Sequence, residues 1–202
     1  MTNHLKVIAF DTASQHCAAA LLLGDRVLTR VDEMSKGQAE HLMPMLDEML
    51  AAEGLSWRDL NAIGVGTGPG NFTGIRIAVS AARGLALGLG KPAIGVNGFD
   101  ARIYGESLPI TAVIPAPRGQ CYVQEFNETG TSSQPKLIPD QETVLADWPS
   151  ATTLKKTAEQ LISATAWITA ERIGKDTHRP TPLYVRAADA APPRDQAPAI
   201  LL

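Results

Sequence analysis

The residues with the clearest potential for chemistry lie in a glycine-rich stretch at residues 66–74, with the sequence GTGPGNFTG. Glycines between a strand and a helix expose backbone N–H groups at the helix N-terminus, where anions such as phosphate bind. Two phosphate-binding patterns are incomplete here. Asn71 follows Gly70 where a P-loop has lysine, and Thr73 replaces the third glycine of a dinucleotide fingerprint. The stretch therefore fits a tight turn with Thr73 near a helix cap, while Gly68 and Gly70 remain candidates for cofactor binding.

A carboxylate, Asp11, follows the first apolar segment and is itself followed by Thr12. In sheets that hydrolyse nucleotides, an aspartate at this place can hold a magnesium ion through water. The same side chain can instead accept hydrogen bonds from neighbouring backbone N–H groups and cap the turn, and a single carboxylate favours this interpretation. Asp11 and Thr12 are candidate cofactor-binding residues, although the sequence as a whole predicts no cofactor.

Metal ligands and activated nucleophiles are sparse. No two histidines lie within five residues of each other, so we expect neither a zinc-protease helix nor another paired metal site. The four histidines are His4, His16, His41 and His178. Cys17 and Cys121 stand alone, which fits a reducing compartment better than a disulfide framework. No Gly-x-Ser-x-Gly sequence is present, and we therefore expect no catalytic residues.

The hydrophobic pattern predicts an α/β protein whose strands and helices would position these residues. Strands are expected at residues 5–10, 17–23, 26–29, 62–66 and 93–96, and helices at residues 38–52 and 73–87. A helix that joins two apolar strands favours a mixed sheet within an α/β layer. In the second half, strands are expected at 109–114 and 120–126, helices at 141–146 and 154–173, and an extended or disordered proline-rich end at 190–202.

Both helices of the first half have more apolar surface than one face of a sheet can cover, so we expect a partner protein to cover the rest. The expected partner-binding residues are Gln38, His41, Leu42, Met45, Leu46, Met49, Phe72, Ile75, Arg76, Ala78, Val79, Ala82 and Arg83. Arg76 and Arg83 are seven residues apart and share a helix face. They fit either a solvated stripe or the polar rim of an interface.

Composition excludes several classes of protein. The chain has 202 residues, 45% of them hydrophobic, and 18 basic against 21 acidic residues give a net charge of −3. This excludes a disordered chain and a coiled coil. Neither half is basic enough to attract nucleic acid, so contact with RNA is expected to be shared or indirect. The longest apolar run, residues 17–23, is too short to span a bilayer, and no signal peptide is evident, so we expect a cytoplasmic protein without membrane contact.

Several segments resemble the TsaB (YeaZ) family, in the same order along the chain. They are IAFDT at residues 8–12, QAEHLMP at 38–44, GPGNFTGIR at 68–76, PAIGV at 92–96 and PLYVR at 182–186. The resemblance covers almost all of residues 5–100, and GPGNFTGIR is its most specific part. It identifies the chain with a family that supplies a partner subunit in bacterial synthesis of the threonylcarbamoyl modification on tRNA.

The resemblance implies an actin-like, sugar-kinase-like ATPase fold with ribonuclease H-like lobes. The first lobe would be complete in residues 1–100, and the second would be reduced in residues 101–202 with a flexible tail. TsaD, a related catalytic subunit, carries a histidine pair where this chain has Gly98 and Arg102. Since neither residue can ligate a metal as imidazole does, the metal centre of TsaD is expected to be absent.

The function implied by the resemblance is that of a non-catalytic scaffold. It would bind TsaD through the helices at 38–52 and 73–87 and support threonylcarbamoyl transfer to adenosine 37 of tRNAs that read ANN codons. TsaE would join the larger complex, tRNA would be engaged indirectly, and the chain alone would form a homodimer. An alternative remains open, namely an actin-like ATPase or small-molecule kinase that uses Asp11 and the loop at residues 66–74.

Overall fold

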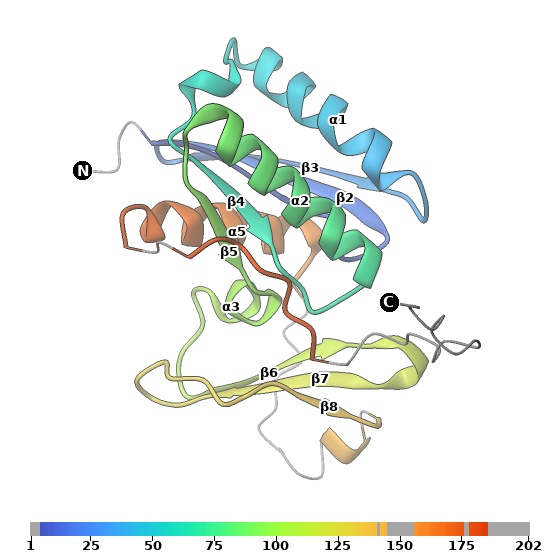
Figure 1. The fold of residues 1–202 in the computed structure, drawn as a ribbon. Helices are drawn as coiled ribbons and strands as arrows, with labels where there is room; N and C mark the ends of the chain where they lie inside the picture. The colour runs from blue at the N-terminus through green and yellow to red at the C-terminus, as the bar shows by residue number, and fades with distance from the viewer. Residues whose placement is uncertain (1–4, 141, 145–155, 176–177, 186–202) are drawn as a thin grey trace, which may run out of the picture.

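The computed structural model describes residues 5–140, 142–144, 156–175 and 178–185, and its centre is a five-stranded mixed sheet (Figure 1). The strands are β1 (Lys6–Asp11), β2 (His16–Leu23), β3 (Arg26–Glu33), β4 (Ala62–Gly66) and β5 (Ala93–Val96). Their order is β3-β2-β1-β4-β5, with β1, β2 and β3 antiparallel and β4 and β5 parallel to β1. The sheet is therefore a hairpin meander extended by a strand–helix–strand unit.

Helices cover both faces of this sheet. α1 (Gln38–Ala52) and α2 (Phe72–Leu89) lie on one face, and α5 (Ala158–Arg172) lies on the other (Figure 1). α5 starts with a capping box in which Thr157 accepts from the Gln160 N–H and Gln160 reaches back to the Thr157 N–H. α2 ends before Gly90, which has a left-handed backbone conformation. Glycine adopts this conformation without strain because it has no Cβ.

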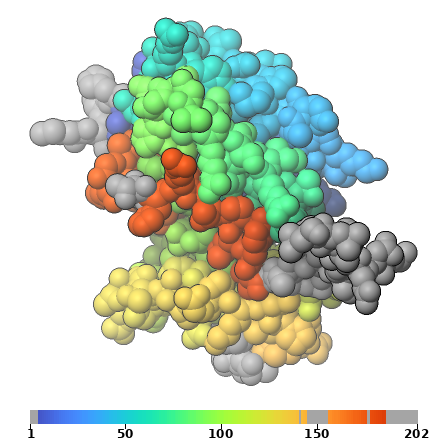
Figure 2. Space-filling model, in the orientation of Figure 1, coloured from blue at the N-terminus to red at the C-terminus, as the bar shows by residue number. Residues whose placement is uncertain are grey.

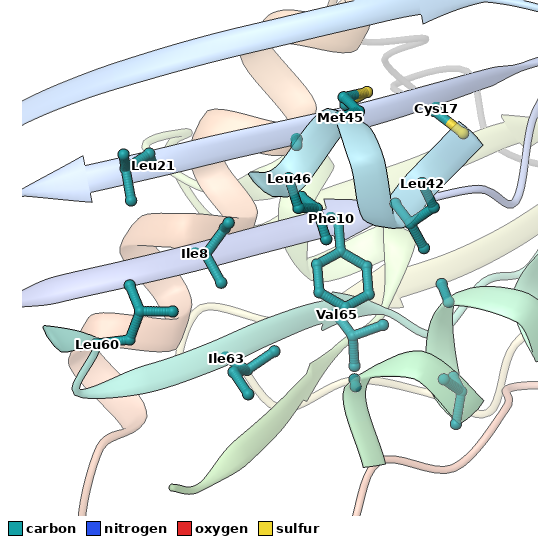
Figure 3. Packing of buried hydrophobic residues seen from close by; sticks show 14 of the residues in the cluster. Ile8, Phe10, Cys17, Leu21, Leu42, Met45, Leu46, Leu60, Ile63 and Val65 are labelled. Atoms are coloured by element: carbon teal, nitrogen blue, oxygen red, sulfur yellow. The ribbon is translucent and has the colours of Figure 1, made fainter. Parts of the chain in front are cut away.

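The alternation of side chains along β1 divides the core into two layers. Ile8 and Phe10 point toward α1 and α2, where they meet Leu42, Met45 and Leu46 of α1 (Figure 3). Val7 and Ala9 point the other way and pack under α5. Because successive strand residues face opposite sides, one continuous apolar strand supplies both layers.

A second, smaller sheet follows the first. Its strands are β6 (Ile110–Pro115), β7 (Cys121–Phe126) and β8 (Lys136–Ile138), in the order β6-β7-β8, all antiparallel. Short 3-10 turns lie at Trp57–Asp59 and Pro117–Gly119. The helix α3 (Gly98–Ile103) connects the sheets and places Phe99, which is fully buried, against β6 and β7. The short β8 and α3 were not predicted from the hydrophobic pattern, although Asn97 caps α3 by accepting from the N–H groups of Phe99 and Asp100.

The C-terminal segment (residues 178–185) returns across the first sheet and joins it to the second. The backbone N–H of Leu183 donates to the carbonyl oxygen of Thr67 just beyond β4, at 2.8 Å. Leu183 and Val185 also pack into the apolar cluster around Phe99 in the second sheet. The segment is therefore bound to both parts of the molecule.

Two expectations about the second half need correction. α5 packs on the first sheet, so residues 101–202 do not form one separate lobe, because Ile162 and Ala166 complete the core layer under β1 and β2. The helix expected at 154–173 begins at Ala158, and residues 154 and 155 lie outside the described part of the chain. Of the helix expected at 141–146, the structure describes only residues 142–144, and these are helical. The proline-rich end expected at 190–202 lies outside the described residues.

Candidate functional site

Asp11 lies at the end of β1, directly beside the end of the parallel strand β4. Its Oδ1 accepts a hydrogen bond from the backbone N–H of Ala13 at 2.7 Å, so the carboxylate caps the turn as expected. Gly66 faces Asp11, and a Cβ at this position would overlap the Asp11 carboxylate. The glycine is required because the two strand ends approach so closely.

The Asp11 carboxyl group is poorly solvated. Burial raises its pKa, while the Ala13 N–H and the nearby His16 and Arg102 oppose this shift. Burial also lowers the pKa of Arg102, whose Nη1 donates to the carbonyl oxygen of Gly98 at 3.3 Å. A cavity of about 80 Å³ lies among these groups, lined in part by Asp11, His16 and Arg102. The site therefore holds one carboxyl group and one guanidinium in a poorly hydrated pocket.

The glycine-rich loop is packed against the turn that follows Asp11. Thr12 Oγ1 donates to the carbonyl oxygen of Gly74 at 2.6 Å, and the Asn71 N–H donates to the carbonyl oxygen of Ala13 at 2.7 Å. The Gly74 N–H donates to Asn71 Oδ1 at 2.8 Å, which makes Asn71 the N-cap of α2. The cap expected near Thr73 therefore lies two residues earlier, and at least two amide groups of the loop are used within the chain.

The candidate cofactor-binding residues serve this packing. A Cβ at Gly70 would lie 2.5 Å from the carbonyl oxygen of Ala13. Gly68 has a positive φ of 90° and accepts from the Gly98 N–H at 2.7 Å. Thr12 is fully buried and is used by its bond to Gly74. These residues hold the glycine-rich loop close to the turn after β1. Close packing is therefore enough to explain why glycine and threonine occur at these positions.

An open cleft of about 950 Å³ separates the Asp11 turn from the second sheet. Residues from the starts of α1 and α2, from α3 and from the β6–β7 hairpin line it, including Lys36, Asn71, Arg102 and Tyr122. Within the described ranges, no group of three His, Cys, Asp or Glu residues is placed to hold a metal ion. Asp11 and the glycine-rich loop thus lie beside a cleft, and the hydrogen bonds given above join them to other groups of this chain.

The structure places seven of the expected partner-binding residues inside the core, so these seven assignments are wrong. All are at most 3% exposed and face the sheet from α1 or α2. They are Leu42, Met45, Leu46, Ile75, Ala78, Val79 and Ala82. Helical periodicity identified the most apolar face of each helix correctly, but that face is covered by this chain's own sheet.

The other expected partner-binding residues are accessible. Gln38, His41, Met49 and Phe72 are half-buried, and Arg76 and Arg83 are exposed. On α1, His41 Nε2 lies 2.7 Å from Asp32 Oδ2, in an ion-pair network that Arg30 extends to Glu48.

Both arginines of α2 contact the C-terminal segment. Arg76 Nε donates to the Tyr184 hydroxyl at 3.0 Å, and Arg83 Nε donates to the Pro180 carbonyl oxygen at 2.8 Å. The shared face predicted from their spacing is therefore used partly within the chain.

The outer side of α2 holds exposed residues that were not among the expected partner-binding residues. Leu87 is 86% exposed, and a Cβ at Gly84 or Gly88 would meet open space. Ala81 and Leu85 are half-buried and pack against the core, on another side of the helix from Leu87. We name Gly84, Leu87 and Gly88 the α2 outer face. The signal for it was the sequence GLALGL, which stays apolar on the side opposite the buried stripe.

By length and composition, α2 is the one helix within the described ranges that could cross a membrane. Five of its eighteen residues are nevertheless buried, where they pack on the sheet. A membrane-spanning helix and a helix that packs in the core of a folded domain can share this composition. The packing of α2 on the sheet favours the second.

The topology defines the class of protein. A three-stranded antiparallel meander continued by two parallel strands, with helices on both faces, is the ribonuclease H-like lobe of the actin-like, sugar-kinase-like ATPase fold. A second sheet of three antiparallel strands follows this lobe. A crystal structure from Pseudomonas aeruginosa, described as similar to peptidase YEAZ, has the same fold with a TM-score of 0.67. It is 24% identical and aligns over 90% of this chain and 100% of that chain.

Sequence comparison gives the family. A family model described as TsaD, tRNA N6-adenosine threonylcarbamoyltransferase, matches residues 32–179, which is well over half of the chain. The tRNA threonylcarbamoyladenosine biosynthesis protein TsaB of Escherichia coli K12 is 33% identical over 127 residues, which are 60% of this chain and 55% of that protein. TsaB of Bacillus subtilis 168 is 31% identical over 150 residues, 71% of this chain and 64% of that protein. The chain belongs to the TsaB (YeaZ) family, and it spans about half the length of the curated relatives that it matches.

Proposed function

We propose that this chain is a non-catalytic subunit in the synthesis of threonylcarbamoyladenosine on tRNA. In this role it binds a TsaD-type transferase and supports the conformation that transfers the threonylcarbamoyl group to adenosine. The names of the TsaB relatives and the TsaD-type family model support the pathway. The use of Asp11 and the glycine-rich loop in internal hydrogen bonds supports a non-catalytic role.

The proposal that a partner binds rests on the α2 outer face. It combines a large apolar side chain, Leu87, with glycines that permit close approach of another helix. Figure 2 shows α2 running across the middle of one side of the molecule, beside α1. Covering Leu87 with another surface would remove its apolar side chain from water, which is favourable, and the glycines beside it leave room for a second helix.

Charge on the neighbouring helix defines the expected chemistry of the partner. The exposed residues Glu40, Asp47 and Glu48 lie on α1, which contains no lysine or arginine, although Arg30 of β3 pairs with Glu48. α2 contains Arg76 and Arg83 and no carboxylate. A partner helix pair should therefore present basic groups to α1 and apolar small residues to α2. When the transferase is absent, a second copy of this chain related by a two-fold axis is expected to cover the α2 outer face.

The direct test is calorimetric titration of a TsaD-type transferase with the wild-type chain and with Leu87→Glu. Covering a leucine contributes about 1.5–3 kcal/mol, so its replacement should weaken binding by about 10- to 100-fold. Leu108→Glu is the matched control, because Leu108 is also exposed, at 37%, but precedes β6 in the second sheet. We expect Leu108→Glu to bind as the wild type does.

Three results would contradict the proposal. Equal binding of Leu87→Glu and the wild type would exclude the α2 outer face, and equal weakening by both variants would show that the effect is not local. Partition of the wild-type chain onto lipid vesicles without binding to the transferase would support a membrane role instead. In sedimentation of the chain alone, Leu87→Glu should shift a dimer toward monomer.

A further inference from the structure

The chain has a net negative charge, but two of its segments contain no carboxylate side chains. Residues 60–99, which include α2, contain no aspartate or glutamate, and neither do residues 178–185. The C-terminal segment lies alongside α2 (Figures 1 and 2) and accepts hydrogen bonds from Arg76 and Arg83. Arg76, Arg83 and Arg179 are exposed on these two segments. The surface that they form is basic although the whole chain is acidic.

Two of these arginines are held in fixed orientations by neutral partners. The Arg76 guanidinium lies 3.8 Å from the centre of the Phe72 ring, and its Nε donates to the Tyr184 hydroxyl at 3.0 Å. Arg83 Nε donates to the Pro180 carbonyl oxygen at 2.8 Å. Among the described residues, no carboxylate forms an ion pair with either arginine.

This arrangement leaves the terminal nitrogens of both guanidinium groups available. A guanidinium offers five N–H donors, and each of these two groups uses only its Nε in the bonds described above. The two arginines are seven residues apart, or about 10 Å along the helix axis. Fixing the guanidinium through Nε lowers the entropy that is lost when the terminal nitrogens bind a phosphate.

An aromatic surface lies beside these donors. The rings of Phe72 and Tyr184 are 4.8 Å apart, and Tyr184 remains 40% exposed. Aromatic rings next to arginine are the groups on which unpaired RNA bases stack. We name the surface formed by Phe72, Arg76, Arg83, Arg179 and Tyr184 the basic face.

We propose that the basic face binds the phosphate backbone of tRNA, with Tyr184 available for stacking against an unpaired base. This inference rests on the proposed role in tRNA modification, and it adds a direct contact where the overall charge indicated an indirect one. Three arginines neutralise up to three phosphates, so the logarithm of the affinity should fall with the logarithm of salt concentration with a slope of about −2 to −3. Such a contact is weak alone and adds to contacts made by a partner subunit.

The test is fluorescence anisotropy of labelled, unmodified tRNA with the full chain, between 50 and 200 mM salt. The double variant Arg76→Gln/Arg83→Gln should lower the affinity at the lowest salt by about tenfold or more and reduce the salt slope by about 2. Arg26→Gln is the matched control, because Arg26 lies on β3 and pairs with Glu53, away from the basic face. Circular dichroism melting identifies any variant that does not fold, and Arg76→Lys/Arg83→Lys then serves as a second variant that keeps the charge and the salt slope.

The proposal is overturned if the double variant and Arg26→Gln bind tRNA equally, or if the wild type binds anionic lipid vesicles but not tRNA. Titration with the TsaD-type transferase separates this outcome from failure of the proposed function. If only the basic face is wrong, Leu87→Glu still loses the transferase while the arginine variants bind tRNA normally. If the proposed function is wrong, the wild-type chain does not bind the transferase.

Discussion

The rotation of α2 about its axis can be tested by placing the same charge on its two sides. Ala82 is 0% exposed and packs in the layer between α2 and the sheet, whereas Leu87, five residues later, is 86% exposed. Ala82→Glu forces a larger side chain and an unpaired carboxylate into a closed core. Leu87→Glu places a carboxylate in water. The two variants therefore separate the buried side of the helix from the outer side.

The expected magnitudes differ widely. Overpacking costs about 1–3 kcal/mol, and burial of an unpaired polar group adds several more, so Ala82→Glu should cost about 4 kcal/mol or more. This is a large part of the total stability of about 5–15 kcal/mol that is typical of a domain. Leu87→Glu should change the free energy of unfolding by less than about 0.5 kcal/mol, as exposed substitutions usually do.

Urea denaturation followed by circular dichroism measures both effects. Ala82→Glu should be unfolded or should lose most of its transition midpoint, and Leu87→Glu should keep the wild-type midpoint within error. A wild-type midpoint for Ala82→Glu would show that Ala82 does not face the sheet. The burial of the seven corrected residues would then also be wrong.

Three further outcomes follow from the strand ends. Because burial raises the Asp11 pKa, the ionised carboxylate destabilises the fold, so Asp11→Asn should melt at a higher temperature than the wild type at pH 7. This difference should shrink as the pH falls through the raised pKa and vanish below the ordinary value near 3.8; a constant difference would contradict the assignment. Gly66→Ala should lower the melting temperature, and Asp11→Gly in the same chain should restore part of the loss, because the added Cβ overlaps the Asp11 carboxylate. Calorimetry of the isolated chain with millimolar Mg-ATP should give no binding heat, whereas saturable heat that Asp11→Ala removes would favour the ATPase or kinase alternative.

The regular elements of the first half follow from local patterns. The apolar spacing after Gly37 predicts a helix at 38–52, and α1 has these bounds. Short apolar runs predict β4 and β5, because buried parallel strands lack polar alternation. Asp11 at a strand end predicts the capped turn, since its carboxylate reaches an N–H two residues further on.

Contacts between distant segments could not be predicted in this way. Periodicity identifies the apolar side of α2, but it does not distinguish Val79 facing the sheet from Leu87 facing outward. The hydrogen-bond partners of Arg76 and Arg83 are Tyr184 and Pro180, about a hundred residues later in the sequence. Local sequence patterns do not predict contacts over such a separation. The placement of α5 on the first sheet likewise depends on chain topology.

The central claim is that this chain supports threonylcarbamoyl transfer through the outer surface of its helices and without chemistry of its own. The most direct measurement is the amount of threonylcarbamoyladenosine formed on tRNA by a reconstituted TsaD-type transferase system. The wild-type chain and Asp11→Asn should both support the reaction, and Leu87→Glu should lose most of the stimulation. Full stimulation by Leu87→Glu together with loss of activity in Asp11→Asn would contradict the account.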